Sequence, residues 1–389
     1  MSQKLWQPSK GRIKSSNLFR YEKFVSRNYK YKFSQNYKNL LNWSLNNPKD
    51  FWSSIWNYFK VNGIKTNVFK LTSDLINSKF FINSKLNFAE NVLVKNTNEK
   101  AITFISETGY REQRSWKELN TNIKKIITFY KTLNISEGDR VAAYTPNQIE
   151  TVECFLGASA LGAIWSSCSP DFGVPGLVER FSQIKPKILI ITDKYFYNGK
   201  EINIIERLPK ILKNIKSIKH VLILNYPGKK NKKIKKIKGV SFYYFTDVKR
   251  LKVNKKKLKK FDFDHELAIL YSSGTTGKPK CICHRSGGVL LQHLKEHQLH
   301  CDVKPGDNVF YFTTCGWMMW NWLVTALASK ASILLFDGFP FYKSPDLLLK
   351  IANKENVTLF GISAKYIDQL IKLKVNIKNS MKLKSLKTI

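Results

Sequence analysis

The chain has 389 residues, enough for two or more domains, and 43% of them are apolar, an ordinary share for a globular protein. Its 66 basic and 28 acidic residues give a net charge of +38, which would suit a nucleic-acid or anionic-membrane surface. Nearly all of the basic residues are lysines, and asparagine and isoleucine are also abundant, which is the composition that AT-rich codons produce. Arginine, which specific nucleic-acid contacts favour, is scarce, so we expect no specific nucleic-acid partner.

The sequence also gives no sign of export or membrane insertion. Residues 1–6 lack the apolar core of a signal peptide. No uncharged apolar run reaches the roughly 18 residues that span a bilayer, and the longest candidates are broken by Glu153 and by Lys330. The six cysteines are scattered. We therefore expect a cytoplasmic protein with no membrane partner.

Residues 1–85 are rich in aromatic and polar side chains and show no clear strand alternation. Within them, residues 51–59 carry bulky apolar side chains at helical spacing, which predicts an amphipathic helix that docks on a neighbour. Stacking on nucleic-acid bases is the alternative for these rings. It is less favoured, because basic residues are not interleaved there.

From about residue 86 the pattern changes to alternating strands and helices. A run of small residues at 149–163 predicts a tightly packed helix, and the lysine-dense segments at 229–238 and 255–260 predict solvated loops. Short strands separated by helices of ten or more residues imply a parallel sheet and an α/β fold. Buried strands are predicted at 140–144, 188–192, 221–224, 267–270, 309–312 and 333–336.

The ten residues 271–280, YSSGTTGKPK, follow one of these strands. Glycines let the backbone wrap closely around an anion, and consecutive amides form an anion-binding concavity. This is no Walker A loop, because two residues separate the glycines and Pro279 follows Lys278. A polar surface turn is the alternative, but the full pattern favours binding of nucleotide phosphates and so predicts an ATP-using enzyme. The candidate phosphate ligands are Ser272, Ser273, Gly274, Thr275, Thr276, Gly277, Lys278 and Lys280.

Three histidines, at positions 293, 297 and 300, are followed by Cys301 and lie close in the sequence to Cys281, Cys283 and His284. His293 and His297 are four residues apart, as metal ligands on a helix often are. No glutamate follows His293 directly, and the thiols lack the spacing of a paired CxxC knuckle. We therefore favour a polar helix after the loop and expect no metal site.

Residues 315–322, CGWMMWNW, form a second unusual cluster, with three tryptophans and two methionines in its last six positions. The cluster follows the strand predicted at 309–312. Open α/β sheets bind ligands at the carboxyl ends of their strands, and a pocket of methionine and tryptophan suits a short acyl chain. The pattern alone leaves a pocket and a packed core equally open.

The loop at 272–280 resembles the phosphate-binding signature of the adenylate-forming superfamily of acyl-CoA synthetases, luciferases and peptide-synthetase adenylation domains. Residues 80–91 resemble the segment that joins the amino-terminal cap to the main domain in its acetyl-CoA and acetoacetyl-CoA synthetase branch. Residues 315–322 and 360–366 are similar to acetoacetyl-CoA synthetases in particular, and residues 5–9 fit the same family. The resemblance covers nearly all of the chain.

The resemblance implies the large amino-terminal domain of the adenylate-forming fold, with helix-flanked sheets. Residues 1–85 would form the cap, and residues 86–389 would form a partial AMP-binding (adenylation) domain. In the family, several functional parts come after the matched part. They are the adenine and ribose ligands, the Tyr-Gly-x-Thr-Glu motif, whose glutamate helps hold Mg²⁺, and the small carboxyl-terminal domain with its catalytic lysine. We therefore expect a truncated chain that is inactive or impaired.

The activity that the resemblance implies is acetoacetate-CoA ligase. ATP and acetoacetate would form acetoacetyl-adenylate and pyrophosphate, and the thiol of CoA would then displace AMP; the co-substrates are ATP, Mg²⁺ and CoA. Trp317, Met318 and Met319 would line the acyl pocket, and Lys200 lies where relatives contact the CoA phosphate. Two alternatives stay open: a ligase for acetate or another short acid, and a catalytically dead basic fragment that binds nucleic acid or a partner.

Overall fold

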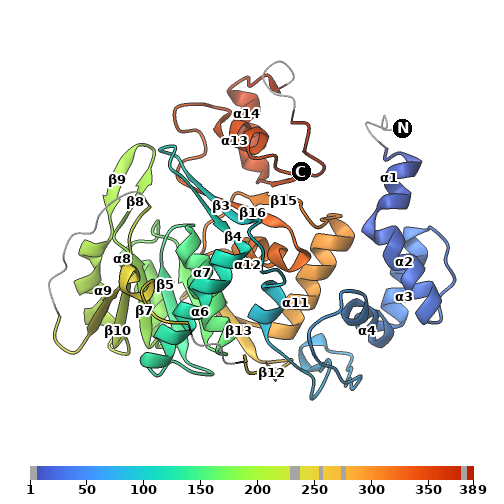
Figure 1. Ribbon diagram of the computed structural model, residues 1–389, viewed down its shortest axis with the longest axis horizontal. Helices are drawn as coiled ribbons and strands as arrows, with labels where there is room; N and C mark the ends of the chain where they lie inside the picture. The colour runs from blue at the N-terminus through green and yellow to red at the C-terminus, as the bar shows by residue number, and fades with distance from the viewer. Residues whose placement is uncertain (1–6, 228–236, 254–256, 273–276, 378–382) are drawn as a thin grey trace.

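The structure is a computed structural model that describes residues 7–227, 237–253, 257–272, 277–377 and 383–389 (Figure 1). The predicted features at residues 1–6 lie outside these ranges, as does most of the lysine-dense segment at 229–238. The described parts of the two lysine-dense segments, 237–238 and 257–260, contain no helix or strand, as predicted. No helix among the described residues is both long and apolar enough to cross a membrane.

The amino-terminal part of the chain is a group of helices at one side of the molecule (Figure 1). The side chain of Ser16 caps the second helix by accepting from the backbone N–H of Phe19, and Trp43 and Trp56 are buried. The helix predicted at 51–59 is confirmed within the last of the four. They are α1 (Lys10–Ser15), α2 (Asn17–Asn28), α3 (Tyr37–Asn46) and α4 (Pro48–Tyr58).

A small antiparallel sheet ties this part to the rest of the chain. Strand β2 (Lys85–Leu86) pairs with β1 (Gly63–Ile64) on one side and with β12 (Phe261–Asp262) on the other. Helix α5 (Phe88–Val92) follows at once, and the side chain of Asn87 accepts from the backbone N–H of Glu90 at its start. The boundary predicted at residue 85 therefore falls inside a sheet that both parts share, and it stays a prediction.

A seven-stranded sheet forms the first main layer, in the order β11-β10-β7-β5-β6-β13-β14. All neighbours are parallel except the edge pair β13 and β14. The predicted strands and the small-residue helix are confirmed to within a few residues. The elements are β5 (Arg140–Tyr144), β6 (Ile164–Cys168), β7 (Ile188–Thr192), β10 (His220–Leu224), β11 (Ser241–Tyr244), β13 (Glu266–Tyr271), β14 (Cys281–Arg285), α6 (Trp116–Thr132), α7 (Ile149–Ala160) and α8 (Val174–Ile184).

A second, five-stranded sheet has the order β17-β15-β16-β3-β4. It too is parallel except at one edge, where β3 and β4 form a hairpin. The short turn at Gly109, with φ of +87°, leaves no room for the crossover that parallel pairing needs. The elements are β3 (Lys100–Ser106), β4 (Arg111–Ser115), β15 (Asn308–Tyr311), β16 (Ser332–Asp337), β17 (Leu359–Gly361), α11 (Ser286–Lys295), α12 (Met318–Thr325), α13 (Leu347–Lys354) and α14 (Ala364–Lys372).

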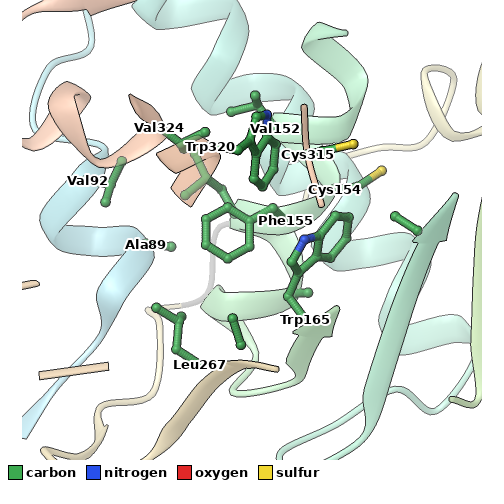
Figure 2. Packing of buried hydrophobic residues seen from close by; sticks show 14 of the residues in the cluster. Ala89, Val92, Val152, Cys154, Phe155, Trp165, Leu267, Cys315, Trp320 and Val324 are labelled. Carbon is green, nitrogen blue, oxygen red and sulfur yellow. The ribbon is translucent and has the colours of Figure 1, made fainter. Parts of the chain in front are cut away.

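One hydrophobic cluster contains residues of both sheets. Figure 2 shows part of it, around helices α7 and α12 and strand β6. Trp165 of β6 stacks on Trp320 of α12, with ring centroids 6.3 Å apart and an interplanar angle of 17°. Phe155 of α7 contacts both rings, at 5.7 and 5.6 Å. The indole N–H of Trp320 donates to the side-chain oxygen of Asn147 at 2.9 Å, so even the polar atom of this ring is satisfied inside the core.

Candidate active site

The phosphate-loop segment connects β13 to β14 at the carboxyl end of β13. Its base is closed by two hydrogen bonds: the backbone N–H of Ser272 donates to the carbonyl of Lys280 at 3.1 Å, and the N–H of Lys280 donates to Oγ of Ser272 at 3.2 Å. Gly277 has φ of +96°, and Lys278 is exposed. Four predicted ligands, Ser273, Gly274, Thr275 and Thr276, lie outside the described residues.

Helix α8 supports the base of this loop from one side. The side-chain amide of Gln183 donates to the carbonyl of Pro279 at 3.0 Å. The guanidinium carbon of Arg180 lies 5.7 Å from the ring centroid of Tyr271 and 4.3 Å from that of Phe172. Neither Gln183 nor Arg180 was predicted from the sequence. The scarcity of arginine in a lysine-rich chain was the available signal for Arg180.

The tryptophan and methionine cluster divides into a packed half and an exposed half. Trp320 and Trp322 are buried in the core, whereas Trp317 is 61% exposed and Met318 is 42% exposed. Met319 is partly buried against the core. The last two tryptophans therefore belong to the core, whereas an acyl pocket formed by Trp317, Met318 and Met319 stays a prediction.

The segment before Trp317 is fixed across the ends of two strands of the seven-stranded sheet. The thiol of Cys315 donates to the carbonyl of Thr145 at 2.7 Å, just beyond β5. Gly316 lies against the end of β6, where an added Cβ would meet the backbone nitrogen of Ser169 at 3.2 Å. Because β6 and β13 are parallel neighbours, residues 317–319 and the phosphate loop follow at the same edge of the sheet.

A cavity of about 200 Å³ opens at the carboxyl ends of strands from both sheets. Such crevices are where open α/β sheets bind ligands. No pattern in the sequence predicted this wall, because its residues come from separate loops. The lining includes Asn147 after β5, Ser169 and Asp171 after β6, Thr313 and Thr314 after β15, and Asp337 at the end of β16.

The carboxyl of Asp337 is a titratable group in the wall of this cavity. Its removal from water raises the pKa of the carboxyl to about 7, although the hydrogen bond from the Tyr226 hydroxyl, 3.0 Å from Oδ2, acts in the opposite direction. Asp337 therefore changes charge near neutral pH. The carboxylate of Asp171, also on the lining, accepts from Oγ of Ser169 at 2.7 Å.

Lys200 lies at the turn of the hairpin formed by β8 (Lys194–Tyr197) and β9 (Lys200–Asn203), and it is exposed. The carboxylate of Glu107, only 5% exposed, holds this turn by accepting from the backbone N–H groups of Asn198 at 2.9 Å and Gly199 at 2.7 Å. It also accepts from the N–H of Phe339 at 2.6 Å, beyond β16. Glu107, which was not predicted from the sequence, therefore fixes the Lys200 hairpin to the cavity wall.

The histidines lie on a helical segment, as predicted, but the prediction that this helix is polar is wrong, because two of the three histidines are buried. A strand, β14, follows the phosphate loop, and α11 then continues into one turn of π-helix at Glu296–His300. His293 and His297 are buried, and burial lowers the pKa of His293 to about 3. The ring of His297 lies 4.1 Å from that of Trp322. Within the described ranges, no group of three or more His, Cys, Asp or Glu side chains could hold a metal ion.

Comparison with known proteins gives one family and a consistent set of relatives. The model of the family described as AMP-binding enzyme matches residues 89–389. The acetoacetyl-coenzyme A synthetase of Rhizobium meliloti (strain 1021) is 38% identical over 370 residues, which cover 95% of this chain and 56% of the relative. The acetoacetyl-CoA synthetase of Gallus gallus is 36% identical over 376 residues, covering 94% and 56%.

The solved structure of acetoacetyl-CoA synthetase from Streptomyces lividans has a TM-score of 0.92 and 31% identity, and the match covers 99% of this chain and 59% of that one. This likeness confirms the predicted α/β fold class. The chain spans about half the length of the curated relatives that it matches. With the family model matching most of its residues, the chain belongs to the AMP-binding enzyme family.

Proposed function

We propose that the chain forms the phosphate- and acyl-binding part of an AMP-forming ligase that activates acetoacetate with ATP and transfers it to CoA. One observation carries the proposal: the loop base closed by Ser272 and Lys280 lies at the same edge of the sheet as residues 317–319. The acid is taken from the names of the relatives, which are acetoacetyl-CoA synthetases.

The chemistry proposed for the loop is electrostatic. As the acid attacks the α-phosphate of ATP, negative charge grows on the departing pyrophosphate, and fixed donors and cations stabilise it. Lys278 and Lys280 supply positive charge, and the hydroxyl and backbone groups of 272–277 supply hydrogen-bond donors. Mg²⁺ would enter with ATP, as part of the MgATP substrate.

The acyl and CoA groups are proposed to bind on the two sides of the loop segment at 313–319. Trp317, Met318 and Met319 would contact the short acyl chain, and the cavity of about 200 Å³ beside them would admit the thiol arm of CoA. Lys200 would pair with a CoA phosphate. The buried Glu107 carboxylate supports this assignment, because it holds the Lys200 turn by two backbone hydrogen bonds.

Two further assignments belong to this proposal. Residues 1–85 act as a cap on an AMP-binding domain that begins at residue 86, which agrees with the family match from residue 89. The protein works in the cytoplasm, and the finding that all six cysteines are free supports a reducing compartment.

Acetoacetate-dependent exchange of labelled pyrophosphate into ATP tests the proposal. The chain would be assayed alone and joined to the remaining carboxyl-terminal part of the Rhizobium meliloti relative. We expect little exchange by the 389 residues alone and clear exchange by the joined protein, with acetoacetate preferred over acetate. A folded joined protein that exchanges with acetate and not with acetoacetate would show that the acid is wrong. Robust exchange by the 389 residues alone would show that they already suffice for the adenylation step.

A further inference from the structure

A second cavity, of about 280 Å³, lies where the amino-terminal helices meet the main part of the chain. Trp52 of α4 and the ring of Phe80 line it on one side, and α11 lines it on the other. Its lining is mainly apolar, yet two charged residues, Asp264 and Arg285, stand at the same opening. Neither the phosphate loop nor the acyl-pocket residues are part of it.

The cavity is at the opposite end of the β13–β14 hairpin from the candidate active site. Tyr271 pairs with Cys281 at the phosphate-loop end, and Glu266 pairs with Arg285 at the cavity end. At about 3.4 Å per residue, five residues of strand separate the two ends by roughly 17 Å. A ligand in this cavity would therefore occupy a site separate from the substrates proposed above.

Its floor is made of aromatic rings that packing already fixes. Phe81 is 1% exposed and Phe263 is 5% exposed, and their ring centroids are 4.9 Å apart. The ring of Trp56 stacks on the ring of Phe263, with centroids 6.1 Å apart. Towards the opening, Trp52 and Phe80 meet edge to face at 6.5 Å. These rings offer flat surfaces that are already in place before a ligand arrives.

Helix α11 presents bare backbone to this space. Gly287 packs tightly, since an added Cβ would meet the ring of Phe263 at 2.2 Å. Its neighbour Gly288, which lines the cavity, would place a Cβ in open space, with no atom within 4 Å. A larger side chain at position 288 can therefore fill the cavity without displacing the helix.

One acid, Asp264, and one cation, Arg285, line the opening, and a second cation, Lys79, lies beside the acid. The guanidinium of Arg285 donates to the carbonyl of Asp264 at 3.3 Å and lies 3.9 Å from its carboxylate. The ammonium of Lys79 is also 3.8 Å from that carboxylate. Two half-exposed cations thus contact the same acid, which leaves hydrogen-bond donors of both for an anionic ligand group.

We propose that this cavity binds a planar aromatic carboxylate of two fused rings. The rings lie among Trp52, Phe80, Phe81 and Phe263, and the carboxylate faces Arg285 and Lys79. Size supports two rings, because an engineered apolar cavity of about 150 Å³ holds one benzene and this cavity measures about 280 Å³. The proposal does not depend on the ligase function.

Calorimetric titration of the 389-residue chain with naphthalene-2-carboxylate tests the proposal, with the uncharged naphthalene-2-carboxamide as matched probe. We expect the carboxylate to bind at least fivefold more tightly than the amide. Gly288→Leu should weaken both probes at least tenfold, whereas Gly288→Ala should weaken them less than threefold. Arg285→Gln should remove the preference for the carboxylate, and Arg250→Gln, which removes an exposed charge elsewhere, should preserve it.

Three results would overturn the proposal: no binding of either probe at millimolar concentration, equal binding of both probes, or unchanged binding by a folded Gly288→Leu variant. If Gly288→Leu does not fold, the comparison of Arg285→Gln with Arg250→Gln decides. An equal loss of carboxylate affinity in both would mean that the general positive charge of the chain, and not this rim, attracts the probe.

Discussion

At the scale of single residues, Glu107 shows how one buried carboxylate can organise a site. It connects the Lys200 hairpin to the strand end that forms the cavity wall, through three backbone N–H groups. Gly338 lies against it so closely that an added Cβ would meet a Glu107 carboxylate oxygen at 2.7 Å. The arrangement leaves little room for another side chain.

Glu107→Gln should lower the free energy of unfolding by about 2 kcal/mol, because the amide NH₂ would face a backbone donor and leave it unsatisfied. Urea denaturation measures the change. Glu179→Gln, at an exposed position, is the matched control and should change the free energy by less than about 0.5 kcal/mol. Equal effects of the two substitutions would contradict the role assigned to Glu107.

Asp337 predicts a pH dependence of stability with a definite sign. Its pKa is raised to about 7 in the folded chain, above the value of about 3.9 for an unfolded aspartate. The folded state therefore binds more protons between these values, and this group's contribution to stability is lost as pH rises from about 4 to about 7. Asp337→Asn cannot ionise and can still accept from Tyr226. The Tm of the Asp337→Asn variant minus that of the wild type should therefore increase from pH 5 to pH 8. A difference in Tm that stays constant over this range would contradict the assignment.

At the scale of elements, the close approach of helices α6 and α7 depends on a glycine, Gly157, which has no side chain. An added Cβ at Gly157 would meet Cγ2 of Ile126 at 2.6 Å, whereas one at Gly176 in α8 would meet no atom closer than 3.5 Å. Both glycines lie within helices. The pair therefore separates steric overlap from helix propensity.

Gly157→Ala should destabilise the chain by about 1–3 kcal/mol, because overpacking outweighs the gain in helix propensity. Gly176→Ala should stabilise it by about 0.5–1 kcal/mol. Denaturant unfolding measures both changes: the midpoint should shift while the dependence of the free energy of unfolding on denaturant concentration stays the same. Stabilisation by both substitutions would mean that the two helices can move apart freely.

The same scale shows what the sequence could and could not predict. Strands such as 188–192 were predicted because continuous apolar runs report burial on both faces of a parallel sheet. Hydrophobic periodicity does not indicate which strands pair with one another, so neither the division into two sheets nor the antiparallel edge strands β4 and β14 were predicted. Glu107 and Gln183 were missed for a related reason: each acts through backbone groups far away in the sequence.

At the scale of the whole molecule, two sheets share one core, and the candidate site lies where their strand ends meet. The local signature of the phosphate loop could be recognised because its ten residues are contiguous, whereas the cavity wall is assembled from five separate segments of the chain. The charge of +38 acts over the entire surface and attracts any polyanion. A test of phosphate binding must therefore separate the loop from this general attraction.

The most direct test is the affinity of the chain for inorganic tripolyphosphate, which mimics the phosphates of ATP, measured by calorimetry at 150 mM salt. Lys278→Ala should weaken binding at least tenfold, about 1.4 kcal/mol. Lys117→Ala, which removes an exposed lysine from helix α6, should weaken it less than twofold. Equal weakening by both substitutions would contradict the account, because the loop would then contribute no more than any other surface charge.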